Sequence, residues 1–533
     1  MLALTAARGA RAQGNDLSVP MGGRSALMGN TGVALSRDGS APFLNPATVV
    51  RIADNSLAFS VNFYSFASTT LGAWHEPSPP DASHFGDVAL RGKSVGTNGF
   101  RVLPSTLCLF FTIKGVTDQG PSDKGFHRGR QKLAVCFGST EYEDIVMPAL
   151  PFYGSTPLGT TSQTQSVSRN WTRFNVGPTY GISLTDALAI GLSLQGAYTE
   201  ESFSIDSNSV TSTAGGDAVQ SSFGAGGSAY SFDAVAIIGA TYRVGKITFG
   251  ASAELPALHV FGRYAATLNS EYGVAGVDTA MLSGGTGSFS APPPMRFAVG
   301  AGAEWPRLAV ELDGSLQVPV ASISSSLTGW TTSLAGTAAS TASFHAAYSV
   351  PERPAWNAGV GAEYFVSKSF SVIGGTSTSL STLPPLSPAT SLGNLVQGRT
   401  SSATVSFGIG SYGGGADLLI GAQLGYAWGQ MLAVNPYALP NDWAVVGTSS
   451  YSALLILAGA TDLSNIGRVA GRVERAVSGD PEPSPPAPPA GGGTRAPERG
   501  PPKAGGLDPR SDAPQTPKPP PSPAPSGSTA HPP

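Results

Sequence analysis

Apolar and polar residues alternate with a period of two over much of the chain, in about fourteen segments between residues 55 and 460, each near the roughly 10 residues that a tilted strand needs to cross a membrane. In the segment 356–364 the even positions are apolar, with Trp356 and Tyr364 at its ends, and the odd positions are Asn, Gly, Gly and Glu. An apolar stripe between two aromatic residues is typical of a lipid-facing strand surface. The pattern predicts an all-β fold, a fourteen-stranded antiparallel transmembrane β-barrel.

The same alternation recurs at 188–198, 297–305 and 418–428. The face opposite the apolar stripe carries mostly Gly, Ala, Ser and Thr. The water-facing side of a soluble β-sandwich would carry Lys and Glu instead, because it is solvated. Small residues therefore favour a crowded, polar barrel lumen over a solvated surface. The aromatic residues at the strand ends and the alternating link lengths described next disfavour a secreted soluble β protein.

The links between strands alternate in length. Short turns are predicted near Leu184–Asp186, Val244–Lys246, Pro306, Lys368 and Gly413–Gly415. Long links are predicted between them, at roughly 202–228, 264–294, 320–354, 381–400 and 431–448. Outer-membrane barrels have short periplasmic turns and long extracellular loops, so this order supports a barrel. Its even strand number places both ends of the barrel in the periplasm. The link 114–130 is an exception, because it is long where a short turn is expected.

Composition narrows the function classes. Charged residues make up 12% of the chain, against about a quarter in soluble globular proteins. The net charge of -3 gives no basic surface for nucleic acid, and no apolar run reaches the roughly 18 residues of a membrane helix. The six histidines show no ligand spacing, and no nucleophile elbow, Walker loop or Ser/His/Asp set is visible. We therefore expect no nucleic-acid partner, no metal, no cofactor and no enzyme activity.

The stretch before the first strand, residues 21–47, has neither a helical nor a strand period and is rich in Gly, Ala and Asn. Its ordered motif consists of Gly22, Gly23, Gly32, Asp38, Asn45, Pro46 and Ala47. This motif resembles the N-terminal hatch of the outer-membrane long-chain fatty-acid and hydrocarbon transporter family, the FadL-like proteins. The resemblance implies a hatch that plugs the barrel lumen, with Phe43 and Leu44 as the nearest apolar candidates for the floor of a ligand pocket.

Charged residues on the predicted lumen face are a second set of candidates. They are Arg173, Asp233, Glu254, Arg296, Glu304 and Glu363. These side chains could line a path or bind a carboxylate. We favour the alternative that they pair with one another and hold the hatch, because buried charges are rarely left unpaired.

The two cysteines, Cys108 and Cys136, lie mid-strand on strands adjacent in sequence and are predicted to face inward. A disulfide and two buried free thiols both remain open, because strand register decides between them and cannot be read from the sequence.

The expected organisation has five parts. Residues 1–12 are a residual signal peptide, indicated by the small-x-small sequence Ala10-Arg11-Ala12, with a disordered cytoplasmic terminus as the alternative. Residues 13–53 form the hatch, 54–460 the barrel and 461–476 a periplasmic connector. The Pro-rich tail 477–533 is expected to be disordered, as an inert extension or as a tether toward the cell wall.

The resemblance implies passive transport of hydrophobic small molecules, such as long-chain fatty acids, across the cell outer membrane. The expected partners are the hydrophobic ligand, the lipid bilayer and lipopolysaccharide, and the expected state is a monomer. An alternative is a non-transporting structural or secretion-linked surface barrel that binds protein partners. The predicted loops 202–228 and 264–294 support this alternative, because they hold few large apolar side chains to capture a ligand.

Overall fold

The computed structural model describes residues 19–463 except for 53–54, 72–93, 100–102, 115–128, 157–158, 214, 217, 275–276, 321, 351, 387–397, 414 and 436–441. The predicted signal-peptide remnant 1–12, most of the long link 114–130, the connector beyond residue 463 and the tail 477–533 lie outside the described residues. Contacts divide the chain into two units, Met1–Gly471 and Arg472–Pro533, and the first contains the fold.

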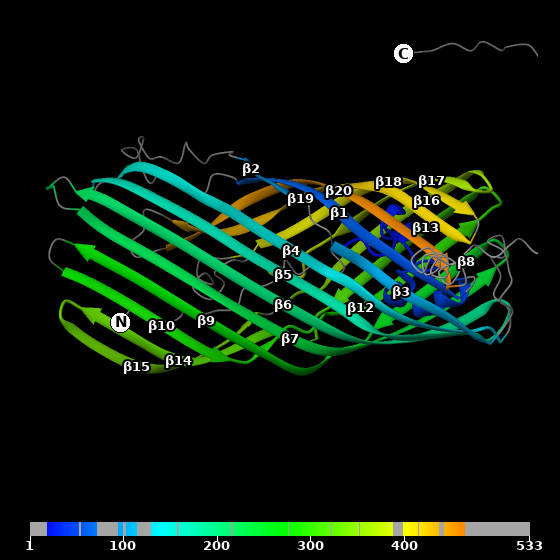
Figure 1. The fold of residues 1–533 in the computed structure, drawn as a ribbon, viewed down its shortest axis with the longest axis horizontal. Coiled ribbons are helices and arrows are strands. Elements are labelled where there is room, and N and C mark those ends of the chain that lie inside the picture. Colours follow the sequence, from blue (N-terminus) through cyan, green and yellow to red (C-terminus); the bar gives the residue numbers. More distant parts are fainter. Residues whose placement is uncertain are drawn as a thin grey trace, which may run out of the picture. The chain divides into compact units, whose positions relative to one another are not determined.

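One closed antiparallel sheet forms the wall of a barrel (Figure 1). Its strands are β1 (Ser56–Leu71), β2 (Ser94–Gly99), β3 (Leu103–Lys114), β4 (Gln131–Thr156), β5 (Gly159–Ser183), β6 (Leu188–Thr213), β7 (Ala218–Val244), β8 (Ile247–Glu254), β9 (Leu258–Val274), β10 (Val277–Gly287), β11 (Phe289–Ser290), β12 (Met295–Glu304), β13 (Leu308–Val318), β14 (Ile323–Ala335), β15 (Ala338–Val350), β16 (Ala355–Ser367), β17 (Phe370–Ser379), β18 (Gly398–Gly413), β19 (Ala416–Asn435) and β20 (Asp442–Asp462). The last strand pairs with the first, from Ser56 opposite Asp462 to Leu71 opposite Thr448, and this ladder closes the barrel.

Several strands are segments of one interrupted crossing. These are β2 with β3, β8 with β9, β10 with β11 and β12, β13 with β14, and β15 with β16. Four of the interruptions contain proline, at Pro256, Pro292–Pro294, Pro319 and Pro354. Proline has no N–H to give to a ladder, so the pairing stops there and resumes beyond. With each interrupted crossing counted once, the wall has fourteen strands, and the predicted fold class is confirmed.

The short turns lie where the sequence predicts them, at one end of the barrel. The three longest predicted loops are wrong. β6 and β7 run through most of 202–228, β9 to β11 through most of 264–294, and β14 and β15 through most of 320–354. These segments extend the wall, and they lie at the left end of Figure 1 together with the long strands β4 and β5. We call the segments 159–171, 201–229, 263–290 and 323–350 the extension.

The membrane part of the barrel carries an apolar outer band. Ile190, Val299 and Val360 are exposed on this face, as the alternation predicts. Exposed aromatic residues border the band, for example Trp356 and Tyr364 at the two ends of one strand segment. Such a band with aromatic edges marks a barrel that spans the outer membrane. Among the described residues, no helix is long and apolar enough to cross a membrane.

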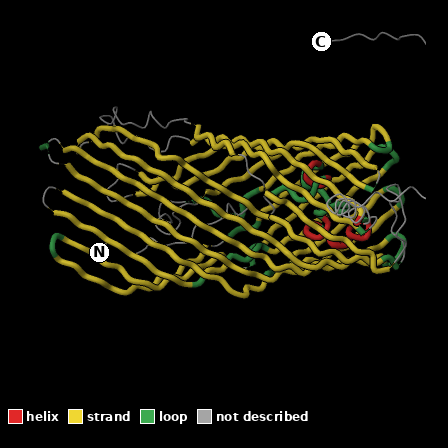
Figure 2. Tube along the Cα trace, in the orientation of Figure 1, coloured by secondary structure: helices red, strands yellow, loops and turns green. Residues whose placement is uncertain are grey.

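Residues 19–52, here called the hatch, lie inside the barrel at the short-turn end (Figures 1 and 2). They contain two single-turn helices, α1 (Arg24–Leu27) and α2 (Ala41–Leu44), and a 3-10 helix, η1 (Pro46–Arg51). Almost every hatch residue is buried. The hatch chain therefore folds against the wall around it and not around a core of its own.

Candidate functional site: the hatch and its seat

Glycines on the inner face of the wall make room for the hatch. A Cβ at Gly250 would overlap the carbonyl of Val33, and a Cβ at Gly361 would overlap the backbone of Met28. Gly191 has the same relation to the backbone of η1. The small residues opposite the lipid-facing stripe therefore seat a second piece of chain, where the sequence had predicted a polar lumen. A lumen face without side chains lets two backbones approach closely.

Two carboxylates of β13 hold four consecutive hatch amides. Asp313 Oδ2 accepts from the N–H groups of Gly32 and Val33, at 2.7 and 3.0 Å. Glu311 Oε1 accepts from those of Ala34 and Leu35, at 2.7 and 2.9 Å. Both side chains are buried, and a buried amide that loses its acceptor costs about 1–3 kcal/mol. This pair is a clamp on the middle of the hatch.

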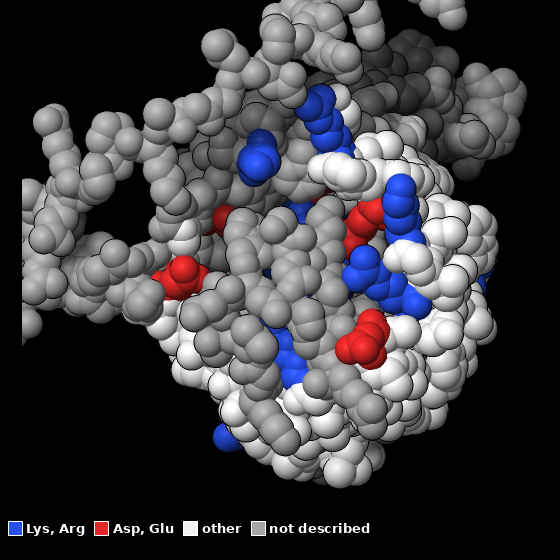
Figure 3. Space-filling view, turned by 90° about the vertical axis from the view of Figure 1, so that its right-hand side faces the viewer, with Lys and Arg blue, Asp and Glu red and all other residues white. Residues whose placement is uncertain are grey.

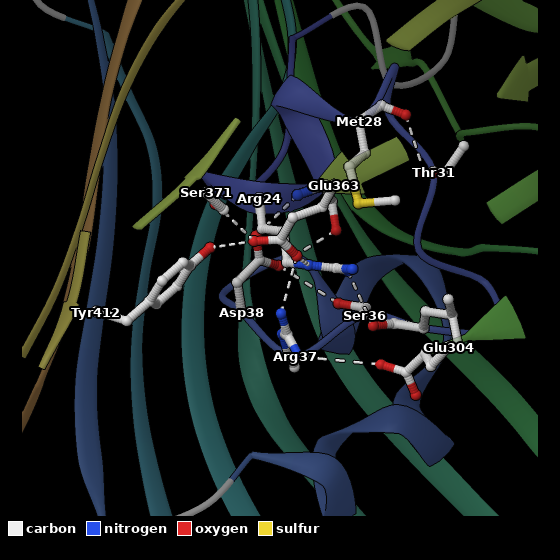
Figure 4. Close-up of polar contacts among 12 residues, drawn as sticks. Arg24, Met28, Thr31, Ser36, Arg37, Asp38, Glu304, Glu363, Ser371 and Tyr412 are labelled. Carbon is white, nitrogen blue, oxygen red and sulfur yellow. Dashed lines mark hydrogen bonds and ion pairs between the residues drawn. The ribbon is translucent and has the colours of Figure 1, made fainter. Parts of the chain in front are cut away.

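An ion-pair network joins three hatch arginines to the wall. Arg24 Nε and Arg37 Nη2 donate to Glu363 Oε2 at 2.7 and 2.9 Å (Figure 4). Arg51 Nη2 donates to Glu304 Oε2 at 2.5 Å. Tyr412 Oη donates to the other oxygen of Glu363 at 2.5 Å. Glu304 and Glu363, predicted as lumen-facing charges, thus contact the hatch directly.

Burial and ion pairing act in opposite directions on the hatch arginines. Burial acts to lower the pKa of Arg24, but the adjacent Glu363 carboxylate outweighs it and raises that pKa above its ordinary value. Burial lowers the pKa of Arg51, and the pairing with Glu304 opposes this only in part.

Figure 3, which looks at the short-turn end, shows basic and acidic side chains grouped at this end of the barrel.

The motif residues of the hatch shape its own backbone. Asp38 accepts from the N–H of Ser25 at 3.0 Å and from the hydroxyl of Ser40 at 2.6 Å, and so joins the two helical turns. A Cβ at Gly22, whose φ is +69°, would lie 2.7 Å from the same carboxylate. At Gly23, a Cβ would overlap that of Ala458 on the wall.

Asn45 links the hatch to itself and to the wall. Its Nδ2 donates to the carbonyls of Val33 and Ala240, at 2.6 and 3.1 Å. Its Oδ1 accepts from the N–H of Ala47 at 3.1 Å and begins η1, in which Pro46 is the first residue. Gly32, which follows α1 in the motif, gives its N–H to the clamp.

Phe43 and Leu44 pack against the wall. The Phe43 ring lies on β4, because a Cβ at Gly138 would be 2.6 Å from it, and it shares an apolar cluster with Cys108 and Phe110. The carbonyl of Leu44 accepts from the hydroxyl of Ser252 at 2.7 Å. Both side chains are buried in this closed arrangement.

The other predicted lumen charges tie the wall to itself and to the hatch. Arg296 pairs with Glu254 at 3.2 Å and donates to the carbonyl of Phe43 at 2.7 Å. Arg173 pairs with Glu141 and donates to the carbonyl of Ala291 at 2.7 Å. Asp233 accepts from the hydroxyl of Ser231 at 2.7 Å and lies 2.9 Å from His259 Nδ1. Arg173 of β5 therefore contacts the bend that precedes β12, and Asp233 of β7 contacts Ser231 and His259 of the wall. None of these contacts involves the hatch.

Above the hatch, the inner face of the extension is largely apolar. Its large apolar side chains that are buried are Val167, Trp171, Phe203, Ile205, Tyr264, Leu268, Phe289, Ile323 and Leu327. The polar side chains buried among them are Arg169, Glu201, Ser207, Ser283, Ser325 and Thr331. Trp171 packs edge-on against Phe289, with ring centroids 6.4 Å apart. The charged side chains among them are paired, as Arg169 is with Glu143 and Glu201. The predicted loops are poor in large apolar residues, but the strand period turns most of those they have inward.

The strand register decides between a disulfide and two free thiols. Cys108 of β3 and Cys136 of β4 are direct cross-strand partners, and the structure joins them by a disulfide. The bond lies on the inner face, buried against the hatch at Gly39. Elsewhere, the described part of the chain holds no group of three or more His, Cys, Asp or Glu residues placed to bind a metal ion.

The residues that sequence reasoning missed are Glu311 and Asp313 of the clamp, Tyr412, and the hatch arginines Arg24, Arg37 and Arg51. Glu311 and Asp313 lie on the lumen face of a correctly predicted strand segment, 307–319. The alternation of apolar and polar positions in that segment was the signal that could have identified them. The arginines stand in a stretch otherwise rich in small residues, and each implies a buried carboxylate partner.

No protein-family model matches the chain, and no curated protein matches it. Several solved structures do match the chain. The toluene transporter TodX of Pseudomonas putida is 13% identical, with 83% of this chain and 98% of TodX covered and a TM-score of 0.51. The CymD monoaromatic hydrocarbon channel is 14% identical (83% and 97% covered, TM-score 0.47), and a Pseudomonas aeruginosa FadL homologue is 12% identical (84% and 99%, TM-score 0.45). At such identities the likeness to TodX shows a shared fold.

Proposed function

We propose that this protein is a passive outer-membrane channel for hydrophobic small molecules such as long-chain fatty acids. The observation that carries the proposal is the apolar inner face of the extension, on the extracellular side of the membrane band. An apolar solute gains about 25 cal/mol for each Å² of surface that it buries, so such a face can draw it out of water.

Two further features support the proposal. The hatch closes the short-turn end of the barrel through noncovalent contacts such as hydrogen bonds, which can break and re-form as a gate requires. The fold is shared with TodX, which is described as a toluene transporter. We also propose that Phe43 and Leu44 form the floor of the ligand pocket when the hatch shifts, since they are the two large apolar side chains of α2 and are buried against the wall in the closed arrangement.

The test is binding of a fluorescent long-chain fatty acid to the detergent-purified full chain, with toluene as a competitor. We expect saturable binding that weakens in Ile205→Ser, which places a hydroxyl on the apolar inner face. The matched control is Val210→Ser, because Val210 lies on the same strand but is exposed on the outer face. No binding of either probe by the wild type would contradict transport and favour a structural or secretion-linked surface barrel. Equal binding by both variants would place the ligand elsewhere.

A further inference from the structure

The outer face of the extension carries a hollow that is separate from the hatch and from the apolar inner face. It has a volume of about 700 Å³ and lies across β7, β9, β10 and β14, which pair side by side in the lower part of Figure 1. Thr267, Thr328 and Trp330 line the hollow and are exposed. Leu268 and Leu327, which alternate with them, are buried on the inner face, so the hollow opens outward.

Cross-strand pairing arranges the outward side chains of the hollow in two rows. Residues directly opposite each other on neighbouring strands point to the same face, with their Cβ atoms about 5 Å apart. The row nearer the membrane part is Ser228, Ala265, Thr286 and Thr328. The row beyond it is Gly226, Thr267, Gly284 and Trp330. Neither row holds a charged residue, and Trp330 is their one large apolar side chain.

An aromatic ring lies beside free hydroxyl groups in this hollow. Trp330 is 46% exposed, and a Cβ at Gly284 would lie 3.8 Å from its ring, so the space beside the ring is open. Within the part of the chain that the structure describes, no residue forms a hydrogen bond with the hydroxyls of Ser228, Thr267 or Thr286. A hydroxyl both donates and accepts, and an aromatic face packs against apolar C–H groups. The combination suits an uncharged ring that carries many hydroxyl groups.

Other kinds of ligand fit the hollow less well. An anion is bound by Arg or Lys in most sites, and the two rows have neither. A stable protein interface buries about 800 Å² of each partner and depends on a cluster of large aromatic or Arg side chains. Trp330 alone does not make such a cluster. The chemistry of the two rows therefore favours a sugar.

The hollow lies just beyond the membrane band. Tyr198 of β6 and Tyr230 of β7 stack with ring centroids 6.4 Å apart, and Phe261 of β9 packs edge-on against Tyr230 at 6.4 Å. Aromatic side chains of this kind mark the border between membrane and water. Ser228 and Gly226 follow Tyr230 into the extension. At about 3.3 Å per residue, the two rows lie about 7 and 13 Å past this border along a tilted strand, at the level of the polar headgroups.

We infer that this hollow binds a sugar ring of the core oligosaccharide of lipopolysaccharide, the glycolipid that surrounds a barrel in the outer membrane. Trp330 packs on the C–H face of the sugar, and Thr267 and Thr286 bond its hydroxyls. Arg263 is exposed opposite Tyr230, in the next row toward the membrane, where the phosphate groups of such a lipid lie. The inference does not depend on transport, and it gives the outer face of the extension a role of its own.

The test is binding of core oligosaccharide, released from lipopolysaccharide by mild acid, to the full chain purified in detergent. A probe without lipid has no affinity for the apolar membrane band. Trp330→Ala removes the ring, and Gly284→Leu fills the space beside it. The matched control is Leu334→Ala, because Leu334 lies on the same strand and face and is 44% exposed. Isothermal titration measures the Kd of each variant, after circular dichroism has shown that it folds.

We expect Trp330→Ala and Gly284→Leu each to weaken binding about tenfold, because one loses the stacking surface and the other blocks it. Trp330→Phe keeps a smaller ring and should weaken binding about threefold. Leu334→Ala should bind as the wild type does.

Absence of binding by the wild type at millimolar oligosaccharide would overturn the inference, and so would equal weakening by Leu334→Ala. A wild-type dimer that Trp330→Ala dissociates would show that a second copy, and not a sugar, occupies the hollow. Failure of the wild type to bind a fatty acid would overturn the proposed function and leave this site untouched.

Discussion

The same strands run through the membrane part of the barrel and through its extension, but their large apolar side chains face outward in the first and inward in the second. In β6, Ile190, Leu192 and Leu194 face outward in the membrane part, and Gly191, Ser193 and Gln195 face inward. Further along the strand the parity is unchanged, but Phe203 and Ile205 now face inward and Ser202 and Asp206 outward.

Each face matches what lies against it. Lipid surrounds the membrane part, so its outer face is apolar and its inner face seats the hatch backbone. Water surrounds the extension, so its outer face is mostly polar and most of its large apolar residues turn inward, with exceptions such as Val210 and Trp330. The medium outside the wall, lipid or water, therefore decides which face of a strand is apolar. The strand itself runs through the membrane part and the extension.

The strongest test of the seat removes the clamp. Glu311→Ala with Asp313→Ala leaves four hatch amides without acceptors, at about 1 kcal/mol or more for each, so the hatch should loosen by about 4 kcal/mol. Amide hydrogen exchange at residues 32–35 should then accelerate about 10²- to 10³-fold in a barrel that still folds. Asp206→Ala with Glu271→Ala, two exposed carboxylates of the extension, should leave it unchanged. Equal effects of both pairs would show that the clamp adds nothing.

A charge on the outer face locates the membrane. Leu192→Lys should destabilise the barrel by about 2–4 kcal/mol, because a lysine near the bilayer midplane loses its hydration. Thr267→Lys, on the outer face of the extension, should cost nearly nothing. Unfolding in urea in lipid vesicles measures both. If the two substitutions cost the same, the assignment of lipid and water to the two parts is wrong.

The smallest effect concerns one hydroxyl of the seat. Ser406 Oγ lies 3.0 Å from the carbonyl of Leu27 and accepts from the N–H of Gly29 at 3.1 Å. Ser406→Ala should therefore cost about 1 kcal/mol of hatch stability. Ser326→Ala removes an exposed hydroxyl of the extension, bonded to Ser288 at 2.7 Å, and should cost under about 0.5 kcal/mol. Proteolysis of the hatch under native conditions would rank the two, and the reverse order would contradict the comparison.

Alternation was enough to predict the strand number, the short turns and the lipid-facing stripes such as 356–364. It failed at 202–228, 264–294 and 320–354, because the apolar residues change faces there while the strand continues, so the lipid-facing pattern ends without a turn. The clamp was out of reach for another reason. Asp313 lies 281 residues from Gly32, and its partner is a backbone amide, which has no side-chain signature in the sequence.

The hydrogen bonds of the hatch also bear on the order of assembly, because none of those described joins it to β19 or β20. These two are the last strands that the structure describes, and their pairing with each other and with β1 closes the barrel. The hatch comes first in the chain and could dock on an open sheet that ends at β18, where every hydrogen bond described between it and the wall would already be in place. Closure would then need only apolar contact between hatch and wall. A barrel built in this order never has to thread its plug through a finished ring.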